Sequence, residues 1–195
     1  RTAWVTMKSL NALPHEVTPL ADVIHRRAQQ RWGEAAPSTM IGRHPRFASA
    51  LERVHRFAES DSPVLITGET GTGKELFARA VYLLSRRVGR PFMRVNCAQY
   101  LDGQLMASEL FGHRKGSFTG AATGHVGIFE SGHTGVVFLD EVAELSLPAQ
   151  AMLLRVLGEG ELVPVGETVP RRVDIRVVAA SSRQLGQMVQ RGSFR

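Results

Sequence analysis

The sequence contains one cysteine, no long apolar run, no internal repeat and no low-complexity tract. Because Cys97 has no partner, an internal disulfide framework is excluded, and we expect this thiol to pack inside a protein of the reducing cytoplasm. No apolar stretch approaches membrane-spanning length and no signal-peptide pattern is present, so we predict no membrane contact. The histidines lack the paired spacing of zinc ligands, and we therefore predict no zinc site.

The remaining composition, 43% hydrophobic and 22% charged residues, is that of an ordinary globular protein. The net charge of +6 favours association with nucleic acid or acidic partners. A solvated, arginine-rich surface explains this charge equally well, because no basic run exceeds two or three residues. The chain starts with Arg1 and stops at Arg195 without a turn or cap, and we expect it to be a piece of a longer protein.

The most informative stretch is GETGTGKE, which lies between the apolar run 64–67 and the helical pattern 76–84. A glycine-rich turn that joins a strand to a helix is typical of a phosphate cradle, because its amides and the helix dipole face the anion. Lys74 is expected to reach the β- and γ-phosphates. The predicted nucleotide-binding residues here are Gly68, Glu69, Thr70, Gly71, Thr72, Gly73, Lys74 and Glu75.

Position 75 departs from the usual form of this turn, in which a serine or threonine hydroxyl binds Mg²⁺. Glu75 leaves two alternatives, a metal held in another way or a cradle that has lost its function. A second motif favours the first alternative. The run 135–139 predicts a buried strand that ends in Asp140 and Glu141, as in a Walker B motif. We expect Asp140 to hold Mg²⁺, directly or through water, and Glu141 to orient or deprotonate the attacking water.

Small polar residues end two other predicted strands. Asn96 ends the strand 92–96, where ligands of open α/β sheets bind, although a role as a cap of the next turn is equally favoured. Ser181 and Ser182 end the strand 174–180; they are suited to sensing a γ-phosphate or to capping a turn. The residues alone do not decide between these alternatives.

The segment 111–127 is rich in glycine and lacks periodicity, and such long irregular stretches are usually functional or disordered. Phe118 within it is either a partner contact or a side chain tucked into the core. Elsewhere we predict a helix that Thr18 caps, Pro19 opens and Gly33 follows. Further helices are expected at 45–59, 101–110 and 147–157, with a second loop or short hairpin at 161–167. We divide the chain into an upstream tail with a linker helix, 1–37, and a main domain, 38–195.

With both phosphate motifs and the intervening loop in hand, the chain from Ile41 to Arg195 resembles the AAA+ domain of sigma-54-dependent transcriptional activators, the bacterial enhancer-binding proteins. The most specific match is GSFTGA within ELFGHRKGSFTGA, where the usual form is GAFTGA. The resemblance implies a three-layer α/β P-loop NTPase, a parallel sheet between helices, without the helical lid of the family. It also implies that the loop contacts sigma-54, mainly through Phe118 and Thr119, within Gly116, Ser117, Phe118, Thr119, Gly120 and Ala121.

Further roles follow from the resemblance alone. Glu75 is the family's own residue in its cradle, Asn96 couples Glu141 to the nucleotide state, and Arg195 acts as an arginine finger. DIRVVAASSR resembles the sensor I strand, but Ser181 and Ser182 replace the usual Thr-Asn or Thr-His. Nucleotide contacts are also implied for Ile41 and Gly42.

The resemblance implies an ATPase that uses ATP and Mg²⁺, forms a homo-oligomeric ring, expected to be a hexamer, and remodels the sigma-54 RNA polymerase closed complex. Enhancer DNA would be bound through a C-terminal helix-turn-helix that this chain does not contain. Two alternatives remain: a nucleotide-dependent oligomerisation switch of a DNA-binding regulator without productive hydrolysis, and another kind of AAA+ remodeller. Glu141 argues against the first and the GSFTGA sequence against the second.

Overall fold

The computed structural model describes residues 18–34, 39–42, 44–100 and 102–195, and the chain divides into two compact units, 1–53 and 54–195. Predictions for the upstream tail before Thr18 and for the break around Pro37 lie outside the described residues. The proposed domain boundary at 37/38 stays a prediction. None of the described helices is both long and apolar enough to cross a membrane.

The first unit contains helix α1, Pro19–Trp32, which begins and ends where the sequence predicts. The Thr18 hydroxyl accepts a hydrogen bond from the Ala21 amide at 3.2 Å, and Pro19 occupies the first turn, where no backbone donor is needed. Gly33 follows with a φ of 86°, a conformation that favours glycine. Helix α2, Pro45–Ala58, begins in this unit and ends in the second one.

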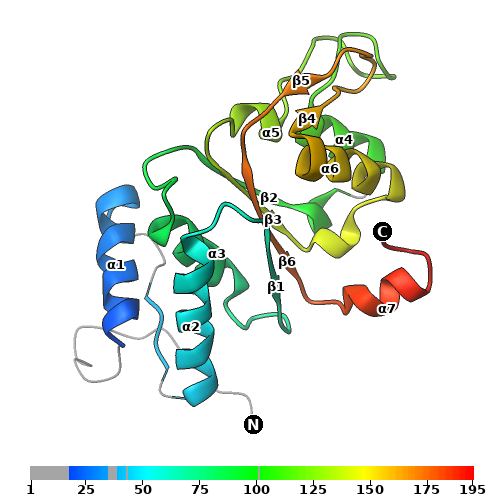
Figure 1. Cartoon of the computed structure of the whole chain (residues 1–195). Helices are drawn as coiled ribbons and strands as arrows, with labels where there is room; N and C mark the ends of the chain where they lie inside the picture. The colour runs from blue at the N-terminus through cyan, green and yellow to red at the C-terminus, as the bar shows by residue number, and fades with distance from the viewer. Residues whose placement is uncertain (1–17, 35–38, 43, 101) are drawn as a thin grey trace. The chain divides into compact units, whose positions relative to one another are not determined.

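The second unit is built on a four-stranded parallel sheet flanked by helices (Figure 1). Its strands, in spatial order, are β1 (Val64–Thr67), β6 (Arg176–Ser181), β3 (Val136–Asp140) and β2 (Phe92–Asn96). The predicted α/β fold and all four predicted strands are confirmed. Thr67 is in register with Ser181, and Asn96 with Asp140, so the strands end at one edge of the sheet.

The helices and minor elements connect these strands. Two are short 3₁₀ turns, η2 and η3, and a two-stranded antiparallel ribbon forms the second sheet. Helix α5, helix α7 and strand β5 were not predicted, because segments of two to six residues carry too few periods to be recognised. The elements are α3 (Lys74–Leu84), η2 (Cys97–Gln99), α4 (Gly103–Phe111), α5 (Ile128–Ser131), η3 (Val142–Glu144), α6 (Leu147–Glu159), β4 (Glu161–Leu162), β5 (Arg171–Arg172) and α7 (Leu185–Gln190).

The core lies between the sheet and helices α4 and α6. Strand β3 is buried along its apolar length, as expected of a parallel strand covered on both faces. Cys97 packs in this core, as predicted, and burial raises the pKa of its thiol to about 12. In the last turn of α2, Phe57 is half exposed whereas Ala58 is buried.

A buried arginine joins the end of α2 to the sheet. Arg176, the first residue of β6, is 1% exposed and donates to the carbonyls of Phe57, Ala58 (3.0 Å) and Ser62 (3.2 Å). Two of these carbonyls belong to the last turn of α2 and have no partner within the helix. The guanidinium, with its five donors, therefore serves three backbone acceptors, of which the Ala58 carbonyl is buried and the Phe57 carbonyl also accepts from the Ser60 amide at 3.2 Å.

We predict that Arg176→Met lowers the free energy of unfolding by about 3 kcal/mol, because it leaves the buried Ala58 carbonyl without its donor and removes two further hydrogen bonds to the chain. Arg155→Met is the matched control, since Arg155 is half exposed and pairs with Glu159 on the same helix. That change should cost less than about 1 kcal/mol. Urea unfolding measures both variants, and equal losses would contradict the anchoring role of Arg176.

Candidate functional site

The glycine-rich turn between β1 and α3 is shaped by left-handed backbone. Gly71 and Gly73 have φ values of 81° and 84°, which a residue with a Cβ adopts only under strain. The Thr72 hydroxyl donates to the Glu69 carbonyl at 2.7 Å and holds the turn closed. Gly73 precedes α3 without a side-chain cap, so the first amides of the helix are left for another acceptor. This geometry suits an anion such as a phosphate.

Lys74 brings the turn and strand β3 together. Its side chain is only 8% exposed, and its Nζ donates to the carbonyls of Gly68 at 3.0 Å and Glu69 at 3.2 Å. The same ammonium lies 3.4 Å from Oε1 of Glu141. The two sequence motifs, far apart in the chain, thus meet through one ion pair at the edge of the sheet.

Glu141 occupies a strained position directly after β3. It has a φ of 50°, unusual for a residue other than glycine. Its Oε2 accepts hydrogen bonds from the backbone amide of Ser182 at 2.9 Å and from the Ser182 hydroxyl at 2.7 Å. Burial alone would raise the pKa of this carboxyl, but the Ser182 hydrogen bonds and the charge of Lys74 outweigh it and lower the pKa.

For Asp140, the last residue of β3, the effect of burial on the pKa outweighs that of the hydrogen bond, unlike for Glu141. Burial raises the pKa of its carboxyl, and the hydrogen bond from the Glu141 amide to Oδ1, at 3.1 Å, only partly offsets this effect. The two neighbouring carboxylates therefore differ in their environments. A cation placed beside Asp140 would favour its charged form, which is the behaviour of a metal ligand.

Glu75 is engaged by two arginines. Its Oε1 accepts from Arg79, one turn along α3, at 2.7 and 3.1 Å, and from Arg94 on β2. Burial would raise the pKa of this carboxyl, but the two arginine hydrogen bonds outweigh it and lower the pKa. The carboxylate that replaces the usual hydroxyl is thus neutralised by the protein itself.

The other polar residues at strand ends make local contacts. Oδ1 of Asn96 accepts from the Ala98 amide at 3.0 Å and caps η2. The Ser181 hydroxyl donates to the Arg183 carbonyl and accepts from the Arg183 amide, both at 3.0 Å. The roles predicted for Asn96 toward Glu141 and for Ser181 toward a nucleotide stay predictions. Ile41 and Gly42 belong to the first unit, and their predicted nucleotide contacts also stay predictions.

The glycine-rich segment 111–127 is held by hydrogen bonds at its base and is partly exposed at its tip. His113 and His125 exchange two backbone hydrogen bonds of 3.0 Å, and Nε2 of His113 donates to the Thr123 carbonyl at 2.9 Å. Nδ1 of His113 lies 2.6 Å from the Ser108 hydroxyl on α4. The Phe118 ring packs edge-on against His113, with centroids 4.9 Å apart, and is neither fully buried nor fully exposed.

The second loop, 161–167, packs against the glycine-rich segment 111–127. The Arg114 amide donates to the Val165 carbonyl at 3.0 Å, and the Val165 amide donates to the Gly112 carbonyl at 2.9 Å. Gly166 approaches so closely that an added Cβ would lie 2.4 Å from the Ser117 Cβ. The Ser117 hydroxyl is buried there and has no hydrogen-bond partner among the described residues. The two loops therefore form one packed unit.

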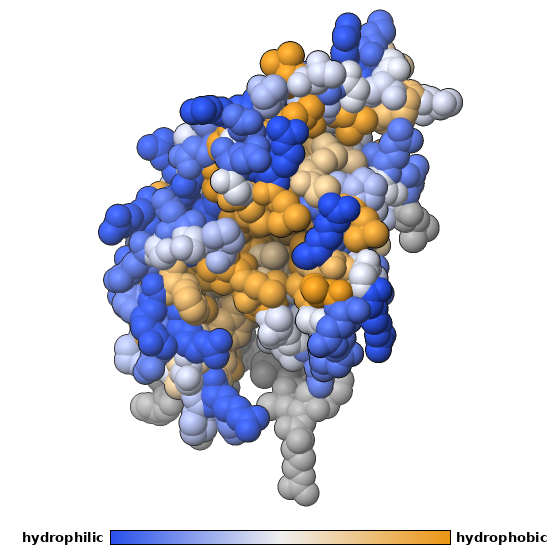
Figure 2. Space-filling model, turned by 45° about the vertical axis from the view of Figure 1, so that its right-hand side comes forward, coloured by the Kyte–Doolittle hydropathy of each residue, from blue (hydrophilic) through white to orange (hydrophobic). Residues whose placement is uncertain are grey.

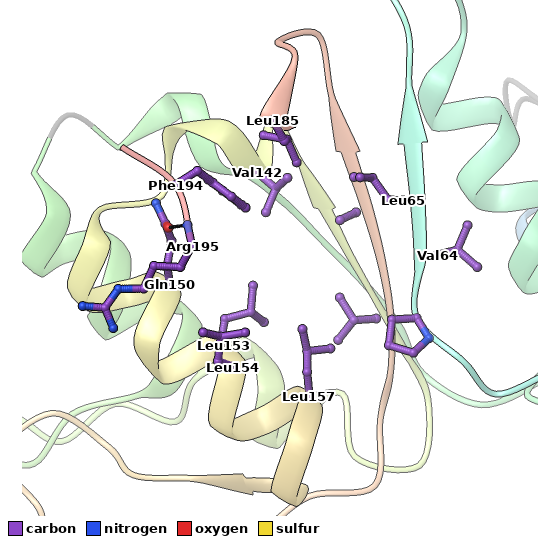
Figure 3. A pocket seen from close by; sticks show the side chains of 13 residues that line it. Val64, Leu65, Val142, Gln150, Leu153, Leu154, Leu157, Leu185, Phe194 and Arg195 are labelled. Atoms are coloured by element: carbon purple, nitrogen blue, oxygen red, sulfur yellow. Dashed lines mark hydrogen bonds between the residues drawn. The ribbon is translucent and has the colours of Figure 1, made fainter. Parts of the chain in front are cut away.

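Arg195 is exposed, and the backbone next to it is tied to α6. The Arg195 amide donates to Oε1 of Gln150 at 2.9 Å (Figure 3). Nε2 of Gln150 donates to the Leu145 carbonyl at 2.8 Å. Gln150 is buried, so its amide fixes the segment that carries Arg195. The role of Arg195 as a finger stays a prediction.

A separate apolar groove opens beside β1 (Figure 3). Figure 2 shows hydrophobic residues gathered in the middle of one face of the molecule. The groove contains none of residues 68–75 and neither acidic residue of β3, so it is distinct from the phosphate cradle. Its apolar lining includes Leu65, Leu153, Leu154, Leu157, Leu185 and Phe194.

Comparison with known proteins identifies the family. The model of the sigma-54 interaction domain matches residues 40–195. The chain belongs to the sigma-54 interaction domain family. It is 49% identical over 166 residues to the Nif-specific regulatory protein of Rhodobacter capsulatus, covering 84% of this chain and 28% of that protein. It is 48% identical over 163 residues to the nitric oxide reductase transcription regulator NorR1 of Cupriavidus necator, covering 84% and 32%. The chain thus spans about a third of these relatives.

A solved structure of the family agrees with the fold. NtrX from Brucella abortus in complex with ATP superposes with a TM-score of 0.73 at 34% identity, over 80% of this chain and 33% of that one. NtrX has also been solved in complex with ADP. The resemblance to sigma-54 activators that GSFTGA indicated is therefore confirmed at the level of the sigma-54 interaction domain family.

Sequence reasoning missed several residues that shape this sigma-54 interaction domain. Arg79 carried a usable signal, because it stands four residues after Glu75 on a predicted helix. Arg94 and Gln150 carried none, since their partners lie 19 and 45 residues away. His113 lay within the quoted motif, but the set of contacts that it makes depends on the folded loop.

We predict that Gly166→Ala lowers the free energy of unfolding by about 1–3 kcal/mol, because its φ of 80° and the Ser117 side chain both oppose a Cβ. Gly158→Ala, on α6 with open space around the added methyl, should instead raise stability by up to about 1 kcal/mol. Thermal unfolding of the two variants checks this difference. Equal effects of both changes would disprove the packing of the two loops.

Proposed function

We propose that this sigma-54 interaction domain hydrolyses ATP and uses the hydrolysis to remodel the sigma-54 RNA polymerase closed complex. The main support is the meeting of Lys74, Glu141 and Ser182 at one edge of the sheet. This arrangement places a phosphate-binding cation beside a carboxylate suited to act as a base. A domain that only bound nucleotide would need the cation but not the carboxylate.

The proposed roles follow the geometry. The amides of the turn 68–73 and Lys74 would hold the phosphates, with Thr70 and Thr72 inside that turn. Glu141 would accept the proton of the attacking water as the new P–O bond forms and the bond to the ADP leaving group breaks. With Glu75 neutralised by arginines, Asp140 is the carboxylate that would hold Mg²⁺. The bound metal would neutralise developing charge on the phosphates.

The proposal extends to the protein that contains this domain. Arg195 would serve the site of a neighbouring subunit in a homo-oligomeric ring, proposed to be a hexamer. Arginine fingers contribute roughly 10³–10⁵ in rate in GTPases, so an isolated subunit should hydrolyse ATP slowly. We also propose that the protein binds enhancer DNA through a helix-turn-helix outside this chain and that it is located in the cytoplasm.

The loop Gly116–Ala121 is proposed to contact sigma-54. Its base is fixed by the His113–His125 pairing and by the second loop, whereas Thr119 at the tip is exposed. A fixed base with an accessible tip suits a loop that presents one or two side chains to a partner. Phe118 rests on His113 and would have to leave this contact to reach sigma-54 with its whole ring.

We predict that Glu141→Gln retains ATP binding but loses turnover by roughly 100-fold or more, because an amide cannot accept the proton of water. Lys74→Ala should instead lose ATP binding itself, since the phosphates lose their buried cation. Titration with a fluorescent ATP analogue and a phosphate-release assay separate the two effects in the intact protein. Wild-type turnover in Glu141→Gln would show that Glu141 is not the base.

We predict that Thr119→Ala preserves ATP hydrolysis and loses sigma-54 binding, because the exposed tip lies away from the phosphate cradle along the chain. Co-elution of the intact protein with sigma-54 in ADP and aluminium fluoride measures the contact. Thr123→Ala is the matched control, an exposed threonine outside the hexapeptide. Equal retention of sigma-54 by both variants would remove the loop from the proposed interface.

A further inference from the structure

A buried glutamine on α6 holds the backbone that leads to Arg195. Gln150 is 3% exposed, and its side-chain amide is used at both ends. Its Oε1 accepts from the Arg195 amide at 2.9 Å (Figure 3). Its Nε2 donates to the Ser193 carbonyl at 3.4 Å. A side-chain amide that pairs with an N–H and a C=O of one segment acts on it as a neighbouring strand would. Gln150 therefore fixes the backbone on both sides of Phe194.

A second set of contacts keeps the same segment in place. Phe194 packs against the core, and the amides of Ser193 and Phe194 both donate to the Met188 carbonyl on α7, at 3.0 and 3.3 Å. Arg195 itself is exposed. A fixed backbone limits the space that an exposed guanidinium can sample, and it lowers the entropy that is lost when this group binds an anion. The segment is therefore suited to present a cation to a group outside this chain.

The same glutamine is joined to the turn that follows Glu141. Nε2 of Gln150 also donates to the Leu145 carbonyl at 2.8 Å. Leu145 ends η3, the short turn that begins at Val142 directly after Glu141. Gln150 thus connects the acidic end of β3, which belongs to the subunit's own site, with the residue that is proposed to serve the site of a neighbouring subunit.

The polarity of Gln150 needs an explanation of its own. The other buried residues of α6 are apolar: Ala149, Leu153 and Val156. An apolar side chain of similar size would pack this face of the helix without the cost of removing an amide from water. The contacts of Gln150 to the segment 193–195 and to Leu145 are what the amide provides in return.

We propose that Gln150 is a positioning residue for Arg195. Its amide holds the arginine where it reaches the phosphates bound by a neighbouring subunit, and it ties this position to the turn after Glu141. The inference rests on the proposed ATPase function and on the proposed role of Arg195 as a finger. It adds the residue that makes this finger effective.

The first test compares hydrolysis by intact wild-type protein and Gln150→Met. Methionine keeps the approximate volume and removes both hydrogen-bonding ends, so kcat should fall roughly 10- to 100-fold, the cost of a small misplacement of a catalytic group. Titration with a fluorescent ATP analogue should show little change, because the phosphate cradle is untouched. Gln187→Met is the matched control, an exposed glutamine on α7 whose amide bonds to Gln184, and it should keep wild-type turnover.

The second test locates the defect by mixing subunits. Glu141→Gln lacks the base of its own site but keeps its finger, so mixing it with Gln150→Met should raise phosphate release well above the sum of the two proteins measured alone. Mixing Gln150→Met with Arg195→Ala should give no such rise, because both lack a working finger. The opposite pattern would overturn the inference, since Gln150 would then act within its own site.

A third comparison shows whether Gln150 acts through Arg195. In the Arg195→Ala background, Gln150→Met should cause no further loss of kcat, and an equal loss in both backgrounds would exclude action through the finger. Should Gln150→Met fail to fold, as thermal unfolding would show, Gln150→Asn replaces it in all three comparisons. Asparagine stays polar, but it is one methylene shorter and cannot span the same partners.

The outcomes separate this inference from the proposed function. If wild type fails to hydrolyse ATP, the proposed function fails. If Arg195→Ala hydrolyses ATP as fast as wild type, the finger role and this inference both fail while the ATPase function stands. If Arg195→Ala loses turnover and Gln150→Met keeps it, the positioning by Gln150 is disproved while both proposed roles stand.

Discussion

The parallel direction of four strands is the constraint on which the site depends. Because β1, β6, β3 and β2 run the same way in register, their carboxyl ends share one edge of the sheet. At this edge lie the turn before Lys74, the acidic pair at the end of β3 and the serines at the end of β6. The crossover helices that a parallel sheet requires also supply the free amides at the start of α3. The proposed chemistry thus follows from topology together with a few side chains.

Charge at this edge is balanced locally. Lys74 compensates Glu141, and two arginines compensate Glu75, so the carboxylate at the usual position of a metal-binding hydroxyl does not leave a second free negative charge beside the phosphates. Asp140 is the carboxylate whose burial is least offset, which is why it fits the proposed metal. Within the same balance, Glu141 also accepts from the amide and the hydroxyl of Ser182.

The loop Gly116–Ala121, which is proposed to contact sigma-54, has to be ordered in spite of its glycine content. A segment rich in glycine loses much entropy when it is ordered, so its base needs strong local ties. These ties are the backbone pairing of His113 with His125 and the packing of the second loop at Gly166. The tip around Phe118 and Thr119 is closed by its own backbone hydrogen bonds, from the Gly116 amide to the Ala121 carbonyl at 2.8 Å and from the Ala121 amide to the Phe118 carbonyl at 3.0 Å. The buried, unpaired hydroxyl of Ser117 is a cost within this arrangement that the more usual alanine would not carry.

The sequence by itself determined the four strands of the parallel sheet, the long helices with the caps of α1, and the phosphate and acidic motifs, because each is encoded by residues close together in the chain. The tertiary structure alone decided that Ser182, not only Lys74, contacts Glu141, that Arg94 engages Glu75, and that Gln150 holds the segment of Arg195. It also decided that Asn96 caps η2 and that Phe118 rests on His113. Some of these contacts join segments that strand order and loop packing bring together, and others select one of several possible local partners. No spacing of residues in the sequence specifies either kind of contact.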